Sequence, residues 1–337
     1  MKKTCLKAPY QFERIESPVP EISDEQVLLA IRQIGICASD MQMYHGLHKY
    51  MTFPVVFGHE AAATVCKVGK NVKGFSEGDN VTVEPQVFCG ECEPCRSGFY
   101  NVCEHLKVMG VHMDGFACDY YAIKPMYLHH AYDLNDDYTA LIEPLAVGIG
   151  SARRGNVKNK TVCVVGAGTI GNLVAQSAKA LGAEAVLVTD IKDNKLDYAK
   201  QCGIDYAVNT LDKTLNDVIT DTFGARKADV IIDCAATPGS ILSVLQAARP
   251  RSVIVITGNF KVPVEIEIPL IQRQEIDILG HMMYRRIDFE EAIQAARDGR
   301  IHLKDFVTQH YSMGSVAEAF RFIDENSDNV MKVMLRN

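Results

Sequence analysis

The chain has 337 residues, of which 47% are hydrophobic and 23% are charged, as in an ordinary globular protein. At roughly 100–200 residues per domain, this length predicts two domains. The net charge of −7 argues against a nucleic acid or an anionic membrane as partner. No apolar run reaches the ~20 residues of a membrane span, and the first residues lack the apolar core of a signal peptide. We therefore expect a cytoplasmic protein.

The first 140 residues contain short β-like runs separated by glycine-containing turns. Many short strands with this punctuation favour an irregular barrel or sandwich. The predicted strands are residues 26–37, 61–69, 78–85 and 116–123.

After about residue 150, β-like and helical patterns alternate, which predicts βαβ units and a parallel sheet. A composition change near Pro144–Gly150 marks the candidate junction between the two parts. The predicted strands here are 161–168, 184–190, 228–234, 251–258 and 275–280, and the predicted helices are 172–183, 194–203 and 241–249. The last part of the chain has helical patterns at 289–299 and 315–325 and a strand pattern at 330–336.

A G-x-G-x-x-G motif, 166–171, follows the first of these strands and opens a helix. This context is typical of a Rossmann dinucleotide site, in which the glycines let the backbone approach a pyrophosphate at a helix N-terminus. Asp190 ends the next strand, where a carboxylate binds the ribose 2′-hydroxyl and repels a 2′-phosphate. No arginine follows directly, so the sequence favours NAD over NADP. The predicted cofactor-binding residues are Gly166, Gly168, Thr169, Ile170, Gly171 and Asp190.

Four of the eleven cysteines lie close together, with the spacing C-x2-C-x2-C-x7-C. Four thiolates satisfy a tetrahedral zinc ion and leave no position for water or substrate, so this pattern predicts a structural zinc site. An iron–sulfur cluster is the alternative, but the spacing differs from the common ferredoxin runs. The predicted ligands are Cys89, Cys92, Cys95 and Cys103.

A second set of metal-type residues is dispersed: Cys37 in GICASD, His59 and Glu60 in FGHEAAA, and Glu143 in ALIEPLAVGIG. Glu143 is a carboxylate in an apolar run, where a charge needs a helix start open to solvent, an ion-pair partner or a metal. One thiolate, one imidazole and a carboxylate form the ligand set of an open catalytic zinc site. From spacing alone this second site is a hypothesis.

Taken together, GICASD, FGHE, the four-cysteine segment, ALIEPLAVG and VVGAGTIG resemble the zinc-dependent medium-chain dehydrogenases/reductases, the alcohol dehydrogenase superfamily. The glutamate in its EPL context is similar to the sorbitol (polyol) and threonine dehydrogenase branch. The resemblance implies an α/β fold: a GroES-like β-rich catalytic domain with an inserted Rossmann domain. We expect the catalytic domain at 1–146, the Rossmann domain at 147–280 and a return to the catalytic domain at 281–337.

The resemblance also implies roles for single residues. Cys37 and His59 match catalytic zinc ligands. Glu60 matches the acidic position after the histidine, a ligand in some polyol dehydrogenases, and Glu143 matches the acidic fourth position, which in this branch contacts zinc directly or through its water. Ser39 matches the hydroxyl that takes the substrate proton, and Lys195 matches a lysine that contacts the cofactor ribose. The histidine of the family's proton relay is replaced by Gln42, for which His45 and His48 are substitutes to consider. An Arg-Tyr pair of some sorbitol dehydrogenases is out of register here, where the sequence reads MMYRR.

The implied activity is reversible oxidation of a secondary alcohol, such as a polyol, sugar alcohol or sugar acid, with NAD, a catalytic zinc ion and a structural one. A threonine dehydrogenase-like enzyme or another zinc alcohol dehydrogenase is the alternative, and a non-catalytic NAD-binding scaffold is a third. The family implies a homodimer or homotetramer. We expect a small-molecule substrate and neither a nucleic acid nor a membrane as partner.

Overall fold

The computed structural model describes residues 1–337 and separates into two compact units. The first, here called the β-rich unit, contains Met1–Glu143 and Leu303–Asn337. The second, the parallel-sheet unit, contains Pro144–His302, so residues 281–302 group with the parallel sheet. The predicted fold class, a β-rich domain combined with a doubly wound parallel sheet, is confirmed.

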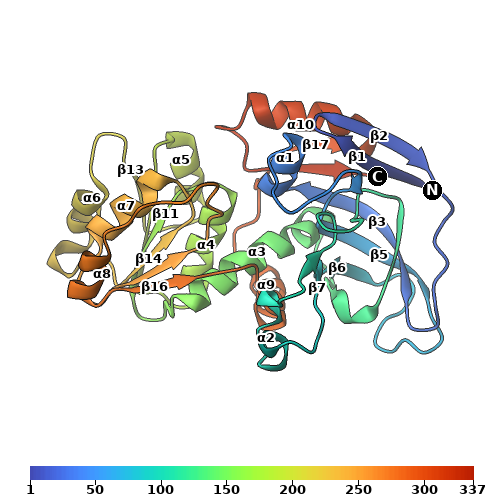
Figure 1. Cartoon of the computed structure of the whole chain (residues 1–337), viewed down its shortest axis with the longest axis horizontal. Helices are drawn as coiled ribbons and strands as arrows, with labels where there is room; N and C mark the ends of the chain where they lie inside the picture. Colours follow the sequence, from blue (N-terminus) through green and yellow to red (C-terminus); the bar gives the residue numbers. More distant parts are fainter. The chain divides into compact units, whose positions relative to one another are not determined.

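The β-rich unit is built on a seven-stranded sheet in the order β10-β6-β5-β3-β18-β17, with β9 also paired to β3 (Figure 1). Strand β18 is antiparallel to β3 and parallel to β17. A strand from the end of the sequence therefore lies beside the strand that leads to Cys37. The strands are β3 (Val27–Ile36), β5 (Glu60–Val68), β6 (Asn80–Val83), β9 (Tyr120–Ile123), β10 (Leu128–His130), β17 (Val307–Ser312) and β18 (Lys332–Arg336).

Two small sheets and several short helices complete this unit. The sheets are β2-β1-β4 and β7-β8. Rings from β2, α1 and α10 pack against one another and join these elements, as in the tilted pairs that Phe320 makes with Phe12 and Tyr44. The strands are β1 (Lys2–Ala8), β2 (Gln11–Glu16), β4 (Val55–Val56), β7 (Gln86–Val87) and β8 (Lys107–Val108). The helices are α1 (Ala38–Tyr44), α2 (Glu93–Arg96), α10 (Val316–Glu325) and the 3-10 turns η1 (Tyr100–Val102), η2 (Pro125–Tyr127) and η4 (Met313–Ser315).

Helix α3 (Asp136–Arg154) contains the candidate junction Pro144–Gly150 and continues through it. Proline removes a backbone donor and normally interrupts a helix, so the sequence around Pro144 did not predict one. The boundary between the two units falls at Glu143 and Pro144, inside this helix.

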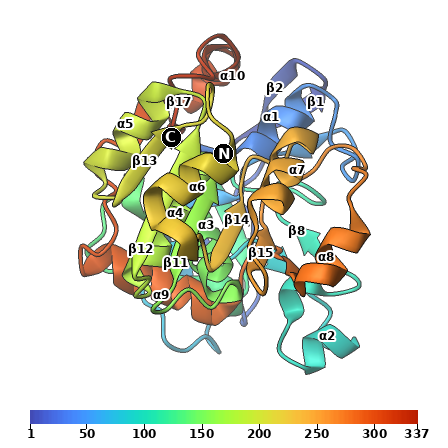
Figure 2. The same cartoon turned by 90° about the vertical axis from the view of Figure 1, so that its left-hand side faces the viewer.

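The parallel-sheet unit has six strands in the order β13-β12-β11-β14-β15-β16, all parallel (Figure 2). Numbered from its first strand, this is the 3-2-1-4-5-6 order of a dinucleotide-binding fold. The strand order reverses between β11 and β14, where such folds bind their ligand. The strands are β11 (Thr161–Val165), β12 (Ala185–Asp190), β13 (Tyr206–Asn209), β14 (Val230–Asp233), β15 (Val253–Ile256) and β16 (Asp277–Gly280).

Helices cover both faces of this sheet because its strands are apolar on both sides. Val162, Val164 and Val186 pack with α4 and α5, whereas Cys163 and Leu187 pack with α6 and α7. None of the helices of the protein is long and apolar enough to cross a membrane. The helices of this unit are α4 (Thr169–Ala180), α5 (Asp193–Gln201), α6 (Leu215–Phe223), η3 (Gly224–Arg226), α7 (Pro238–Ala247), α8 (Ile268–Gln274) and α9 (Arg286–Arg297).

Candidate metal centres and cofactor site

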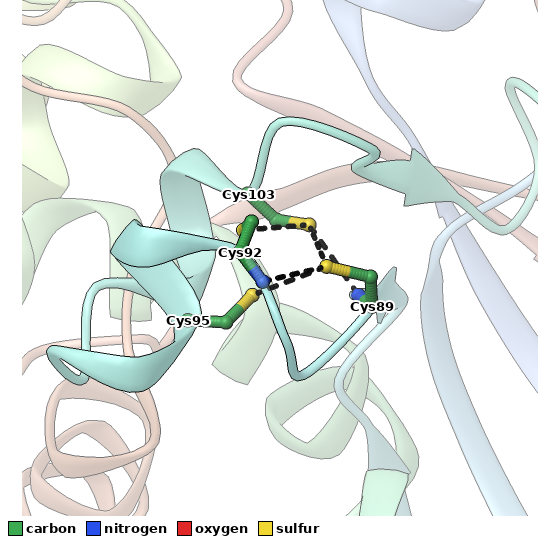
Figure 3. A group of neighbouring side chains, drawn as sticks. All are labelled: Cys89, Cys92, Cys95 and Cys103. Carbon is green, nitrogen blue, oxygen red and sulfur yellow. Dashed lines mark hydrogen bonds between the residues drawn. The ribbon is translucent and has the colours of Figure 1, made fainter.

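The four cysteines of the segment 89–103 converge on one point between β7 and β8 (Figure 3). The sulfur of Cys89 lies 3.9 Å from that of Cys95 and 3.5 Å from that of Cys103, and the Cys92 and Cys103 sulfurs are 3.8 Å apart. A tetrahedral zinc ion with Zn–S bonds of ~2.3 Å separates its sulfurs by about 3.8 Å. The spacing of the four donors therefore fits one zinc ion.

Backbone N–H groups donate hydrogen bonds to two of these sulfurs, Cys89 Sγ and Cys103 Sγ, which stabilises their thiolate form. Cys103 Sγ accepts from the N–H of Cys89 and of His105, both at 3.3 Å. The backbone N–H groups of Cys92 and Glu91 lower the pKa of Cys89 to about 6, whereas loss of hydration raises the pKa of Cys95 to about 12. All four groups ionise together only when a cation offsets their charge.

The second metal-type group lies in the β-rich unit, where β3 and β5 meet. Ligand atoms of Cys37, His59 and Glu60 lie within 4.8 Å of one another. Cys37 directly follows β3 and is the N-cap of α1, His59 directly precedes β5, and Glu60 is its first residue. The structure therefore brings three of the four dispersed residues together, Cys37, His59 and Glu60. Of these, His59 and Glu60 are buried.

Asp40 orients this group. Its Oδ2 accepts from the Cys37 backbone N–H at 2.8 Å, and its Oδ1 lies 3.5 Å from His59 Nδ1. The other ring nitrogen, Nε2, lies 3.5 Å from Ser39 Oγ. With Nδ1 facing a carboxylate, Nε2 is the nitrogen that presents its lone pair on the side of Cys37 and Ser39.

The charge around His59 is strongly negative. Burial disfavours its imidazolium form, but the charge and side chain of Asp40, together with the Cys37 thiol, outweigh this and raise the pKa of His59 well above its usual value. A site that stabilises a cation in this way also suits a metal ion, which replaces the proton.

Glu60 has a further partner, Lys332 of β18. The Lys332 Nζ lies 2.7 Å from both carboxylate oxygens of Glu60 and 3.2 Å from the carbonyl oxygen of Ile36. Glu143 is also buried, 4% exposed, in the part of α3 that belongs to this unit. It is therefore not at a solvent-exposed helix start. It lies close enough to Lys332 to help raise the pKa of that amine.

The other residues considered for a relay or for substrate contact lie as follows. His45 Nε2 is 3.0 Å from Asp324 Oδ2 of α10, which makes it a structural contact. His48 is half-buried, and burial, followed by nearby His112, lowers its pKa. In the parallel-sheet unit Tyr284 is completely buried against Phe289, so its ring packs in the core.

The glycine motif forms the turn between β11 and α4. Gly166 has a φ of 94°, and its carbonyl oxygen would lie 1.7 Å from a Cβ at Gly171, so both positions require glycine. A Cβ at Gly168, the N-cap of α4, would meet no atom within 4 Å. Open space at the helix N-terminus is what a bound pyrophosphate needs, and Thr169 and Ile170 begin the helix there.

Asp190, at the end of β12, lines a cavity of about 620 Å³ together with Gly166. Its Oδ2 accepts from the N–H of Ala167 at 2.7 Å, and its Oδ1 accepts from those of Ile191 and Lys192 at 2.7 and 3.0 Å. A carboxylate has about four acceptor positions, so one remains for a ligand hydroxyl. Lys195 is buried on α5 and is not among the lining residues of this cavity.

Sequence reasoning missed Asp40 and Lys332. The sequence signal for Asp40 is its place three residues after an N-cap, where an acidic side chain closes a capping box. Lys332 is the only charged residue of VMKVML, and a lone charge in an apolar strand is a sign of a buried partner.

Comparison with known proteins agrees with this geometry. A family model described as the alcohol dehydrogenase GroES-like domain matches residues 23–133, and one described as zinc-binding dehydrogenase matches residues 169–298. The chain therefore belongs to the zinc-type medium-chain alcohol dehydrogenases, with a NAD-binding Rossmann domain.

Its relatives include polyol and sugar-acid dehydrogenases. The chain is 32% identical to the sorbitol dehydrogenase of Bacillus subtilis over 345 residues, covering 99% of this chain and 97% of that protein. It is 33% identical to the 2-dehydro-3-deoxy-L-galactonate 5-dehydrogenase of Pseudoalteromonas atlantica over 306 residues, 89% of each chain. The solved structure of RspB, an alcohol dehydrogenase from Escherichia coli CFT073 complexed with NADH, matches with a TM-score of 0.93 and 30% identity, covering 100% of this chain and 99% of that one.

Proposed function

We propose that this protein is a zinc- and NAD-dependent dehydrogenase that interconverts a secondary alcohol and a ketone on a polyol, sugar alcohol or sugar acid. The observation that carries the proposal is the buried group of Cys37, His59 and Glu60, with a hydroxyl, Ser39 Oγ, 3.5 Å from His59 Nε2. The known dehydrogenases of sorbitol and of a sugar acid among its relatives support this substrate class.

The fit of the donors supports a zinc ion at this group. Cys37 and His59 supply a thiolate and an imidazole, and Glu60 and Glu143 are the candidate carboxylates. A bound zinc ion supplies Lewis acidity that favours the alkoxide form of a substrate alcohol. A carboxylate is a harder ligand than a thiolate, so it would leave the zinc ion harder and more electrophilic. Such an ion suits chelation by the two oxygens of a vicinal diol.

The residues of the chain hold and move the proton. Asp40 keeps the His59 ring in one orientation. Ser39 Oγ would relay the proton of the substrate hydroxyl, accepting it while passing its own proton on towards the cofactor ribose and solvent. Gly166, Gly168 and Gly171 leave the backbone of the Rossmann unit open to a pyrophosphate, and Asp190 favours the ribose diol of NAD over a 2′-phosphate. When bound, NAD supplies the acceptor for the hydride. Lys195 remains a proposed ribose contact.

The test is turnover of the purified, zinc-loaded protein on a panel of polyols, sugar acids and threonine, followed by NADH absorbance. We expect NAD reduction with polyols or sugar acids. Cys37→Ser is expected to abolish turnover while NAD affinity is retained, and Ser39→Ala to lower kcat by about 10²-fold or more with zinc still bound. Activity on threonine alone would favour the threonine dehydrogenase alternative.

Metal analysis separates an enzyme from a non-catalytic scaffold. The enzyme requires zinc at both cysteine-containing groups, so two ions per chain are expected, whereas a scaffold keeps only the ion at Cys89, Cys92, Cys95 and Cys103. A homodimer or homotetramer is proposed from the family, and sedimentation of the purified protein tests it.

A further inference from the structure

Lys332 is a lysine whose charge is entirely enclosed by protein. The residue is 3% exposed, and all three of its N–H donors have an acceptor: the two oxygens of Glu60 and the carbonyl oxygen of Ile36. Glu60 is itself 0% exposed. The amine and the carboxylate therefore form a closed, charge-neutral pair, which a buried charge needs.

The structure also makes room for the Glu60 carboxylate in this position. Gly35 of β3 is the residue paired with Glu60 of β5. A Cβ at Gly35 would lie 2.0 Å from Glu60 Oε2, so any other residue there would displace the carboxylate. Two features therefore fix the Glu60 side chain. Gly35 on β3 leaves space for its carboxylate, and the Lys332 amine on β18 binds it.

The same carboxylate belongs to the candidate metal group, with an oxygen within 4.8 Å of ligand atoms of Cys37 and His59. Lys332 and a metal ion therefore compete for its negative charge. Glu143 lies nearby and offers a second carboxylate: although burial opposes the charged amine, Glu60, then Cys37 and Glu143, raise the pKa of Lys332.

Catalytic zinc sites keep three protein ligands and an open position, whereas a fourth protein ligand closes the site. Cys37, His59 and Glu143 would make three ligands, whereas the atoms that the structure brings within 4.8 Å of one another are those of Cys37, His59 and Glu60. If Glu60 bound the metal as well, the position for a substrate oxygen would be filled by an anion of the protein.

We propose that Lys332 is a positioning residue that holds Glu60 as its own ion-pair partner, so that Glu143 is the acidic ligand and one coordination position stays open for the substrate. This inference rests on the catalytic zinc of the proposed function. It assigns to the C-terminal strand a part in the metal site, although no residue of that strand is a ligand.

The decisive variant is Lys332→Met, which keeps an unbranched side chain only one atom shorter and removes the charge. Freed from the amine, Glu60 is expected to turn to the metal. Zinc at the Cys37 group should then bind at least tenfold more tightly in chelator competition, while kcat falls at least tenfold. A purely structural role for Lys332 predicts the opposite for zinc, because a damaged site binds metal more weakly.

Two further variants complete the experiment. Lys332→Arg retains the charge and should keep zinc affinity and kcat near those of the unchanged protein. Lys332→Met combined with Glu60→Gln removes both charges, and zinc affinity should return to its original value. In cobalt-substituted protein, Lys332→Met should change the visible spectrum, and that spectrum should no longer respond to added polyol.

Weaker or unchanged zinc binding in Lys332→Met would overturn the proposal. If this variant does not fold, Glu60→Gln alone decides: unchanged zinc affinity supports the proposal, and a tenfold or larger loss identifies Glu60 as a ligand and refutes it. Zinc affinity is measured without substrate. A lack of dehydrogenase activity in the unchanged protein would therefore count against the proposed function and leave this comparison valid.

Discussion

The carboxylate of Asp40 lies against the imidazole of His59, with Oδ1 3.5 Å from Nδ1 and side chains that are 0% and 7% exposed. Because the same carboxylate accepts the Cys37 backbone N–H, one side chain fixes two candidate zinc ligands at once.

We therefore expect Asp40→Asn to weaken zinc binding at the Cys37 group by roughly 10–100-fold, as loss of a carboxylate behind a ligating histidine generally does. Chelator competition measures the effect. Asp324→Asn is the matched control, because it removes the carboxylate partner of His45, the C-cap of α1, and should leave zinc affinity unchanged. Equal zinc affinity in both variants would show that Asp40 does not orient the ligand.

The four-cysteine segment is predicted to carry a zinc ion that stabilises the fold. Cys92→Ser removes one thiolate of a closed site, so zinc content should fall by one ion per chain and Tm by more than about 5 °C. Cys66→Ser is the control, since Cys66 is exposed on β5 and belongs to neither metal group. Zinc content by elemental analysis and Tm by calorimetry check the prediction, and a variant with full zinc content would contradict it.

Asp190 is predicted to set the choice of cofactor. Asp190→Asn removes the charge that repels a 2′-phosphate, so the ratio of NADP to NAD affinity should rise by about tenfold, equivalent to about 1.4 kcal/mol. The ratio is the informative quantity, because damage to the loop that Asp190 holds would weaken both cofactors alike. Asp197→Asn, an exposed position on α5, serves as control. Calorimetric titration with each cofactor gives the two dissociation constants.

Asp137, in the first turn of α3, is predicted to make stability depend on pH. Its Oδ1 accepts from Gln33 Nε2 at 2.7 Å and from His310 Nε2 at 2.8 Å. Burial alone would raise the pKa of Asp137, but these hydrogen bonds and the nearby charges outweigh it and lower the pKa. A carboxyl whose pKa is lower in the folded state stabilises the fold above its unfolded pKa of about 3.9, and loses this effect as the pH falls through the folded value.

Asp137→Asn should accordingly lower the urea midpoint at pH values above about 5, and the difference from the unchanged protein should shrink towards pH 3. The neighbouring Asp136→Asn is the control, since Asp136 pairs with Arg32 at a more exposed position. A difference that stays constant with pH would contradict the assignment to Asp137.

Local sequence was sufficient for the parts of the site that lie close together in the chain. The four cysteines fall within one short segment, and the glycine motif sits between a strand and a helix that both show their periodicity. The strand expected at 26–37 is β3, Val27–Ile36, and the helix expected at 172–183 is α4, Thr169–Ala180. In each case the residues that determine the local geometry are neighbours in sequence.

Lys332 shows where sequence reasoning stopped. It meets Glu60 across 272 residues, through the pairing of β18 with β3, and no local pattern encodes the register of two strands so far apart. Helix α3 was not predicted because Pro144 is a strong local signal against a helix. In the structure the helix continues through Pro144, so the surrounding contacts outweigh this local preference.

The pairing of Glu60 with Lys332 also has a consequence for how the protein matures. Cys89 to Cys103 emerge from the ribosome together, so their zinc ion can be captured early in synthesis. The partner of Glu60 emerges 272 residues later. At synthesis rates of about 5–20 residues per second, Lys332 is added roughly 14–54 seconds after Glu60, and during this time Glu60 lacks its ion-pair partner. The cysteine centre can therefore be completed within one short segment of the growing chain, whereas the ion pair of Glu60 and Lys332 requires nearly the whole sequence.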